Sequence, residues 1–153
     1  MANIIYTKFF ERLSTGNLDF DDAGTVVRCM LERSTSTYSP NKDHDFVSDL
    51  ASFVEVSVAS YARVTVGTKA VNIDDANDRV ELDCADISFG ALESGQTVDA
   101  IILYLQTGGD DSSASDDPLV CYIETATGLP AVLGGGTFTI TIDAEGLIQF
   151  AQA

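Results

Sequence analysis

Residues 98–105 read VDAIILYL, the most apolar run in the chain. A short apolar run of this length, bounded by turn residues, is typical of an interior strand. We therefore predict a central strand here. Residues 137–143 read TFTITID, in which apolar residues alternate with threonine or aspartate. This period of two is typical of a strand with one buried face.

The same period recurs in short segments that turn residues separate. Residues 70–73 and 79–82 flank the turn DDAND and are predicted to pair as a hairpin. Residues 137–143 are predicted to pair with residues 147–150 as a terminal hairpin, across the turn at residues 144–146. The remaining predicted strands are residues 25–31, 54–58, 61–66, 85–89 and 119–124. Together they predict a mainly all-β fold, an antiparallel β-sandwich of jelly-roll-like type.

One segment has the periodicity of a helix instead. Apolar residues recur at roughly helical spacing in residues 3–13, with charged residues on the other side, which predicts one short N-terminal helix. Residues 46–53 are predicted to form a shorter helical turn that Asp45 caps. No repeat or linker divides the chain. We expect a single domain over residues 1–153, with a helix and arm over 1–16 and a β-sandwich over 17–153.

The charge is strongly negative and unevenly placed. The chain has 24 Asp and Glu against 8 Lys and Arg, a formal net charge of −16. Such a chain cannot neutralise phosphates, so we expect neither nucleic acid nor an anionic membrane as a partner. Residues 80–153 carry twelve acidic residues and no Lys or Arg. The N-terminus lacks the pattern of a signal peptide, so we expect a protein made in the cytosol.

No catalytic, cofactor-binding or metal-binding set emerges from the motifs. His44 is the only histidine, and it lies in a polar loop without a serine elbow elsewhere in the chain. Cys29, Cys84 and Cys121 have no CxxC spacing and are predicted to be reduced and buried. Acidic loops such as residues 107–117 could hold calcium but do not fit the EF-hand pattern. We therefore expect no enzyme activity and no cofactor.

Several segments together carry a family resemblance. The opening MANIIYTKFFERLSTGNLDF resembles the M-A-N-x-x-Y-x-x-F-x-x-x-L-x-x-G start of a family of small virion proteins of tailed bacteriophages. The segments HDFVSDL, ADISFGALESGQTVDAIILYLQTG and YIETATGLP follow in the same order, before the glycine-containing turn that precedes TFTITID. The likeness spans most of the chain and is one of pattern. It implies a product of the head and tail structural genes, with no catalytic residues to carry over.

The resemblance implies a capsid decoration, or cement, protein on the capsid surface of the virion, assembled in the host cytoplasm. Its expected partner is the major capsid protein, and we also expect self-association as a dimer or trimer. A head–tail connector or tail component is the alternative within the virion. A calcium-assisted glycan-binding or receptor-binding β module is a second alternative, and a hydrolase that uses His44 or a pair of carboxylates is a third.

The candidate interface residues lie on the predicted helix: Tyr6, Phe9, Phe10 and Leu13. A short amphipathic helix with adjacent aromatic residues exposes at least one ring, and an exposed ring is a natural anchor for a partner. We therefore expect these residues to serve contact as well as core. The acidic loops at residues 74–78 and 107–117 are expected to face solvent, unless the capsid presents a matching basic surface.

Overall fold

The computed structural model describes residues 3–111 and 113–151. The fold is mainly β with one short α-helix and antiparallel sheets, as the sequence predicts. Its elements are, in chain order, β1 (Ile4–Ile5), α1 (Thr7–Ser14), β2 (Val27–Arg33), the 3-10 helix η1 (Val47–Asp49), β3 (Val64–Thr65), β4 (Ala70–Asp74), β5 (Arg79–Asp83), β6 (Ile87–Ala91), β7 (Thr97–Leu105), β8 (Leu119–Ile123), β9 (Ala131–Val132), β10 (Thr137–Ile140) and β11 (Ile148–Ala151). None of the helices in these ranges is long and apolar enough to cross a membrane.

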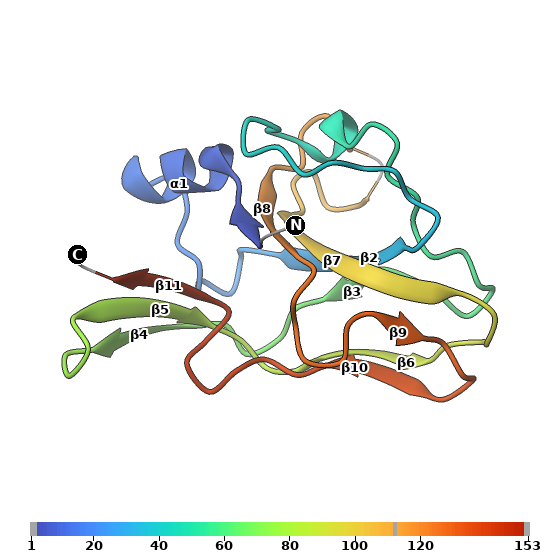
Figure 1. Cartoon of the computed structure of the whole chain (residues 1–153). Helices are drawn as coiled ribbons and strands as arrows, with labels where there is room; N and C mark the ends of the chain where they lie inside the picture. Colours follow the sequence, from blue (N-terminus) through green and yellow to red (C-terminus); the bar gives the residue numbers. More distant parts are fainter. Residues whose placement is uncertain (1–2, 112, 152–153) are drawn as a thin grey trace.

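A six-stranded antiparallel sheet forms the upper layer in Figure 1. Its order is β1-β8-β7-β2-β3, and β9 pairs with the start of β7. The predicted central strand is confirmed, because β7 lies between β8 and β2 and pairs with β2 along almost its whole length. A three-stranded sheet, β11-β5-β4, and a two-stranded sheet, β10-β6, form the lower layer.

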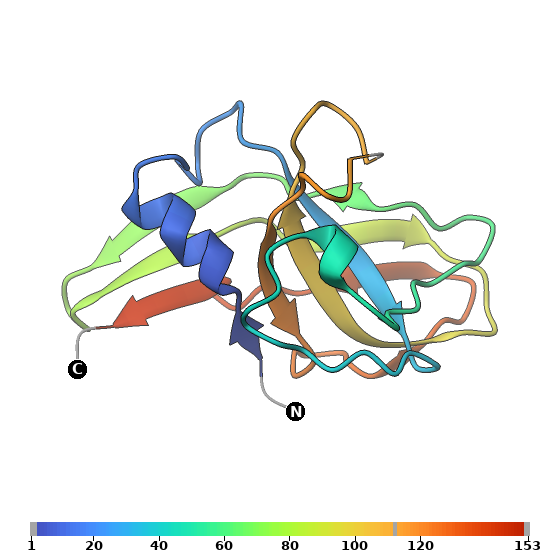
Figure 2. The ribbon, with the colours of Figure 1, turned by 90° about the horizontal axis from the view of Figure 1, so that it is seen from above.

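The six-stranded sheet is buried on both faces, which explains the apolar run of β7. Ile101, Leu103 and Leu105 belong to the main core between the two layers. Ala100, Ile102 and Tyr104 point to the other face and pack in a second buried cluster. The chain between β2 and β3, which contains η1, supplies residues to that cluster and lies over the sheet in Figure 2. Alternate residues of one strand therefore enter two cores.

The β4–β5 hairpin is confirmed, but the predicted terminal hairpin is wrong. β10 pairs with β6, and β11 pairs with β5. Between these strands, the Ile142 backbone N–H donates to the Asp86 carboxylate, 2.9 Å, and the Leu147 N–H donates to the Leu82 carbonyl, 2.8 Å. The turn therefore carries the chain from one small sheet to the other. Alternation shows which face of a strand is buried and leaves its pairing partner open.

Other predicted elements are also corrected. Residues 54–58 form no strand, and they touch β2 through an isolated bridge, Glu32↔Glu55. The Glu55 carboxylate forms an ion pair with Arg63, 2.9 Å. The strand predicted at residues 61–66 is shorter in the structure and consists of β3 alone. The helix begins at Thr7, because Ile4–Ile5 pairs with β8. The carboxylate that holds the start of η1 is that of Asp49, which accepts from the backbone N–H of Asp45 and of Phe46, each at 2.9 Å.

Candidate interaction surface

The three-stranded sheet has one apolar face and one polar face. Its register places Ile73 beside Val80, and Val80 beside Phe150. The next row of the same face contains Val71, Leu82 and Ile148. Because side chains alternate across a strand, the charged residues between them point to the opposite face. Asp74, Arg79 and Glu81 lie there and are joined by ion pairs.

Only one end of this apolar face is covered. Leu82 and Ile148 are 3% and 4% exposed and pack in the main core. Toward the hairpin turn the cover ends, so Ile73 is 75% exposed and Val71 41%. Val80 is exposed too, and Phe150 is half-buried. An exposed group of large apolar side chains on a soluble domain is typical of an interaction site.

Helix α1 extends this apolar surface. It lies over the three-stranded sheet in Figures 1 and 2, and its Phe10 ring meets the Phe150 ring edge-on at a centroid distance of 5.5 Å. Phe10 remains 42% exposed. We call the group Phe10, Val71, Ile73, Val80 and Phe150 the exposed apolar face.

The four predicted interface residues have different environments. Tyr6 and Phe9 are fully buried, Tyr6 in the second cluster and Phe9 in the main core. The Tyr6 hydroxyl lies 2.9 Å from the Tyr38 hydroxyl, and burial raises the pKa of Tyr6 well above its ordinary value. Leu13 is partly buried against the main core. Phe10 is therefore the predicted residue whose ring reaches solvent, whereas the β4–β5–β11 side chains were not predicted as contacts.

The hairpin turn beside the exposed apolar face is acidic. The Arg79 side chain contacts the carboxylates of Asp74, Glu81 and Glu145 at 3.0, 2.8 and 3.3 Å. The hydrogen bond from Asn77 and the nearby Arg79 hold the pKa of Asp74 below its ordinary value. Asp75 and Asp78 extend from the turn into solvent, as the sequence predicts for this loop.

The acidic loop at residues 107–117 is turned inward more than expected, with residue 112 outside the described part. Asp111 forms an ion pair with Arg28, 2.9 Å, and accepts from the Tyr104 hydroxyl, 2.6 Å. Asp117 is fully buried and accepts from the Thr107 backbone N–H at 2.7 Å. These contacts attach the loop to the sheet. Within the described residues, no group of three His, Cys, Asp or Glu side chains is placed to hold a metal ion.

Comparisons with family models, with curated proteins and with solved structures gave no match.

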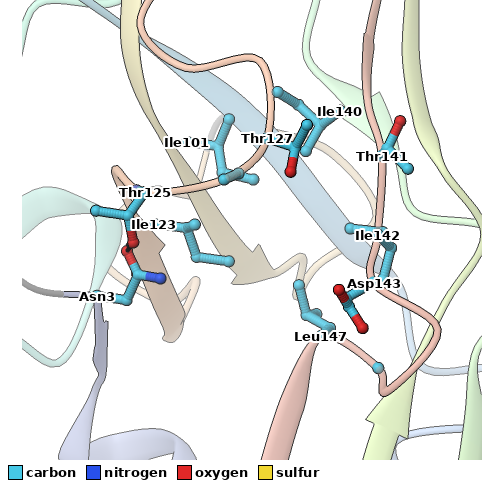
Figure 3. Close-up of a pocket in the computed structure, with 12 residues that line it drawn as sticks. Asn3, Ile101, Ile123, Thr125, Thr127, Ile140, Thr141, Ile142, Asp143 and Leu147 are labelled. Atoms are coloured by element: carbon cyan, nitrogen blue, oxygen red, sulfur yellow. Dashed lines mark hydrogen bonds between the residues drawn. The ribbon is translucent and has the colours of Figure 1, made fainter.

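A cavity with a volume of about 290 Å³ lies between residues that follow β8 and the segment that joins β10 to β11 (Figure 3). Ile101, Ile123 and Leu147 make its apolar floor. Of its lining side chains, Asp143 is the one that ionises. Paired carboxylates are what glycoside hydrolysis normally uses, and this cavity presents a single one.

The other candidate catalytic groups lie apart from this cavity. His44 Nδ1 is 2.9 Å from the Tyr38 hydroxyl, in the segment that covers the six-stranded sheet. The three cysteines are free and buried, as predicted. Burial raises the pKa of Cys84 to about 12, and it also raises the pKa of Cys121. A thiol with a raised pKa carries little thiolate at neutral pH, so these cysteines are poor nucleophiles.

Proposed function

We propose that this chain is a non-enzymatic structural protein of a tailed-bacteriophage virion, a capsid decoration protein that binds and stabilises the shell of the major capsid protein. The exposed apolar face is the observation that carries the proposal. A protein that attaches to a partner needs a surface whose burial favours binding. Burial of apolar area contributes roughly 25 cal/mol per Å² to the free energy of association. The family resemblance of the sequence supplies the virion as the setting.

The rest of the molecule fits a rigid attachment module. Several of its basic residues are engaged in structural contacts. Arg63 binds Glu55 in a bidentate pair, and the Lys69 ammonium donates to three backbone carbonyls. The six-stranded sheet is buried on both faces. A rigid scaffold with one exposed apolar surface loses little conformational entropy when it binds.

Copy number in purified particles tests the role. A decoration protein is expected at a copy number comparable with that of the major capsid protein, located by electron microscopy on the outer shell. A double variant, Phe10→Ser with Ile73→Ser, is expected to leave the particles, because it removes two exposed anchors. Val132→Ser is the matched control, since Val132 is 78% exposed and lies on β9.

Other outcomes separate the alternatives. A copy number that is a small fraction of the capsid subunit, at one vertex or along the tail, would identify a connector or tail component. Absence from the particles would refute the virion proposal. Sedimentation of the isolated chain tests the expected dimer or trimer, because self-association through the exposed apolar face would be lost in the Phe10→Ser, Ile73→Ser variant.

A further inference from the structure

A small cavity lies where the exposed apolar face meets the hairpin turn. It has a volume of about 200 Å³ and is lined by Ile73, Val80 and Phe150 together with Asp75, Asp78 and Arg79. The three apolar side chains come from neighbouring strands in direct register. The two aspartates come from the turn that ends the face. An apolar surface and carboxylates therefore border the same space.

The electrostatics of this cavity are negative despite Arg79. Arg79 is shared by three carboxylates, and the hydrogen bond to Glu145 together with the neighbouring acids raises its pKa. Asp75 and Asp78 are exposed, and no ion pair joins either of them to another described residue. The charge of Arg79 is offset by its three ion pairs, and Asp75 and Asp78 add two negative charges to the lining of the cavity, so a cation that enters it is attracted.

We propose that the exposed apolar face docks a protein surface in which apolar side chains flank a lysine or arginine, and that this basic side chain occupies the cavity. The inference rests on the proposed function, in which the partner is the capsid shell. Lysine and arginine have an apolar stem and a cationic end. The stem packs on Ile73, Val80 and Phe150, while the cation reaches Asp75 and Asp78. Arginine can in addition bind a carboxylate with two parallel hydrogen bonds.

A second copy of this chain fits the surface less well. Each copy has a net charge of −16, so two copies repel each other. Five of its eight basic side chains are already held within the chain, namely Lys8, Arg28, Arg63, Lys69 and Arg79. The charge of the turn therefore selects a partner of opposite charge. From the sequence, residues 74–78 are expected to face solvent. In this proposal they face the partner instead, because the turn borders the exposed apolar face.

Titration of the isotopically labelled chain with short peptides, followed by NMR, tests the chemistry. The probe is acetyl-Leu-Arg-Leu-Arg-Leu-amide. Its comparison peptides replace either both arginines by glutamate or all three leucines by serine. We expect the probe to shift the signals of residues 71–80, Phe10 and Phe150, and to bind at least about tenfold more tightly than either comparison peptide. Added salt is expected to weaken it.

Two variants separate the charged and apolar parts of the surface. Asp75→Asn with Asp78→Asn removes two charges at exposed positions, and Asn tolerates the positive φ of 51° at Asp78. It is expected to weaken binding of the probe peptide at least about threefold, while the NMR signals of core residues keep their positions. Ile73→Ser is expected to do the same. Asp116→Asn and Val132→Ser are the controls, which are expected to leave binding unchanged.

Several results would overturn the proposal. They are equal binding of the glutamate peptide, shifts that gather at the cavity of Figure 3 instead, and no binding at all. Shifts of the same residues that depend on protein concentration without peptide would show a second copy on this face. If the Asp75→Asn, Asp78→Asn variant loses peptide binding but keeps a normal copy number in the particle, this chemistry is rejected and the proposed function stands. Absence from the particle would reject the function.

Discussion

The six-stranded sheet and the three-stranded sheet both have apolar faces, but only the six-stranded sheet has its apolar faces covered. In β7 the apolar side chains of both faces are covered, by the lower layer on one side and by the segment containing η1 on the other. In β4, β5 and β11 one face is apolar, and its cover ends before the hairpin turn. Periodicity thus states which side chains favour burial. The extent of the opposing layer decides which of them obtain it.

The polar groups show the same contrast. Beside the six-stranded sheet, the Tyr122 hydroxyl donates to the buried Glu32 at 2.8 Å, and the Tyr104 hydroxyl donates to Asp111 at 2.6 Å. At the hairpin turn, Asp75 and Asp78 extend into solvent next to uncovered apolar side chains. One small domain therefore contains a covered core and the exposed apolar face. Burial of that face by a partner would remove the most apolar area from water.

The largest expected effect is in the doubly covered sheet. Leu103→Ala is expected to lower the free energy of unfolding by about 2–5 kcal/mol, because Leu103 is fully buried and its removal leaves a cavity. Urea denaturation measures the loss. Val132→Ala, at an exposed site, is expected to change stability by less than about 0.5 kcal/mol. A loss at Leu103 no larger than that of the control would contradict a closely packed core.

The loop at residues 107–117 gives the next largest effect. Asp111→Asn is expected to destabilise by about 1–2 kcal/mol, because Arg28 and the Tyr104 hydroxyl both lose a charged acceptor. Faster hydrogen exchange confined to this loop should accompany the loss. The exposed Asp116→Asn variant is the control. If both variants behave alike, the Arg28–Asp111 pair does not attach the loop.

The buried carboxylate of Glu32 predicts a smaller effect on stability, one that depends on pH. Glu32 is 4% exposed; its burial, with Asp99 and Glu124 nearby, raises its pKa above the ordinary 4.5 although Ser36 and Tyr122 oppose this. In the folded state the proton is thus held more tightly, so the stabilisation is complete below pH 4.5 and is lost as the pH rises through the higher folded value.

Glu32→Gln removes this titration. The parent chain is therefore expected to lose stability relative to the variant as the pH rises from acidic to neutral. Urea denaturation of both proteins over that range measures the difference, in which the other carboxylates cancel. A difference that does not depend on pH would show that the pKa of Glu32 is unchanged by folding.

The smallest expected effect sharpens the comparison most. Ile73→Ala is expected to cost less than about 1 kcal/mol, because Ile73 is 75% exposed although it is as apolar as the β7 residues. Thermal unfolding beside Leu103→Ala measures both sheets in the same way. A cost at Ile73 equal to that at Leu103, and dependent on protein concentration, would mean that the exposed apolar face is already covered by a second copy in solution.

Parts of the fold could be predicted because their signals are local. The apolar run of β7 and the turn between β4 and β5 each lie within a few residues, and both predictions are confirmed. The terminal hairpin failed because β10 and β11 pair with distant strands. Of the exposed apolar face, only Phe10 is predicted from the sequence as a candidate contact. Val71, Ile73 and Val80 alternate in the sequence as core residues do, so no local signal marks them as exposed.

The sequence by itself determined the β class, the short helix, the interior strand and the strong negative charge. These follow from periodicity and composition, which act through neighbouring residues and through the sum of charges. The tertiary structure decided that Tyr6 and Phe9 are buried while Phe10 is not, and that the hairpin extends beyond its cover. Burial depends on what another part of the chain places against a side chain, and that is a property of the assembled layers.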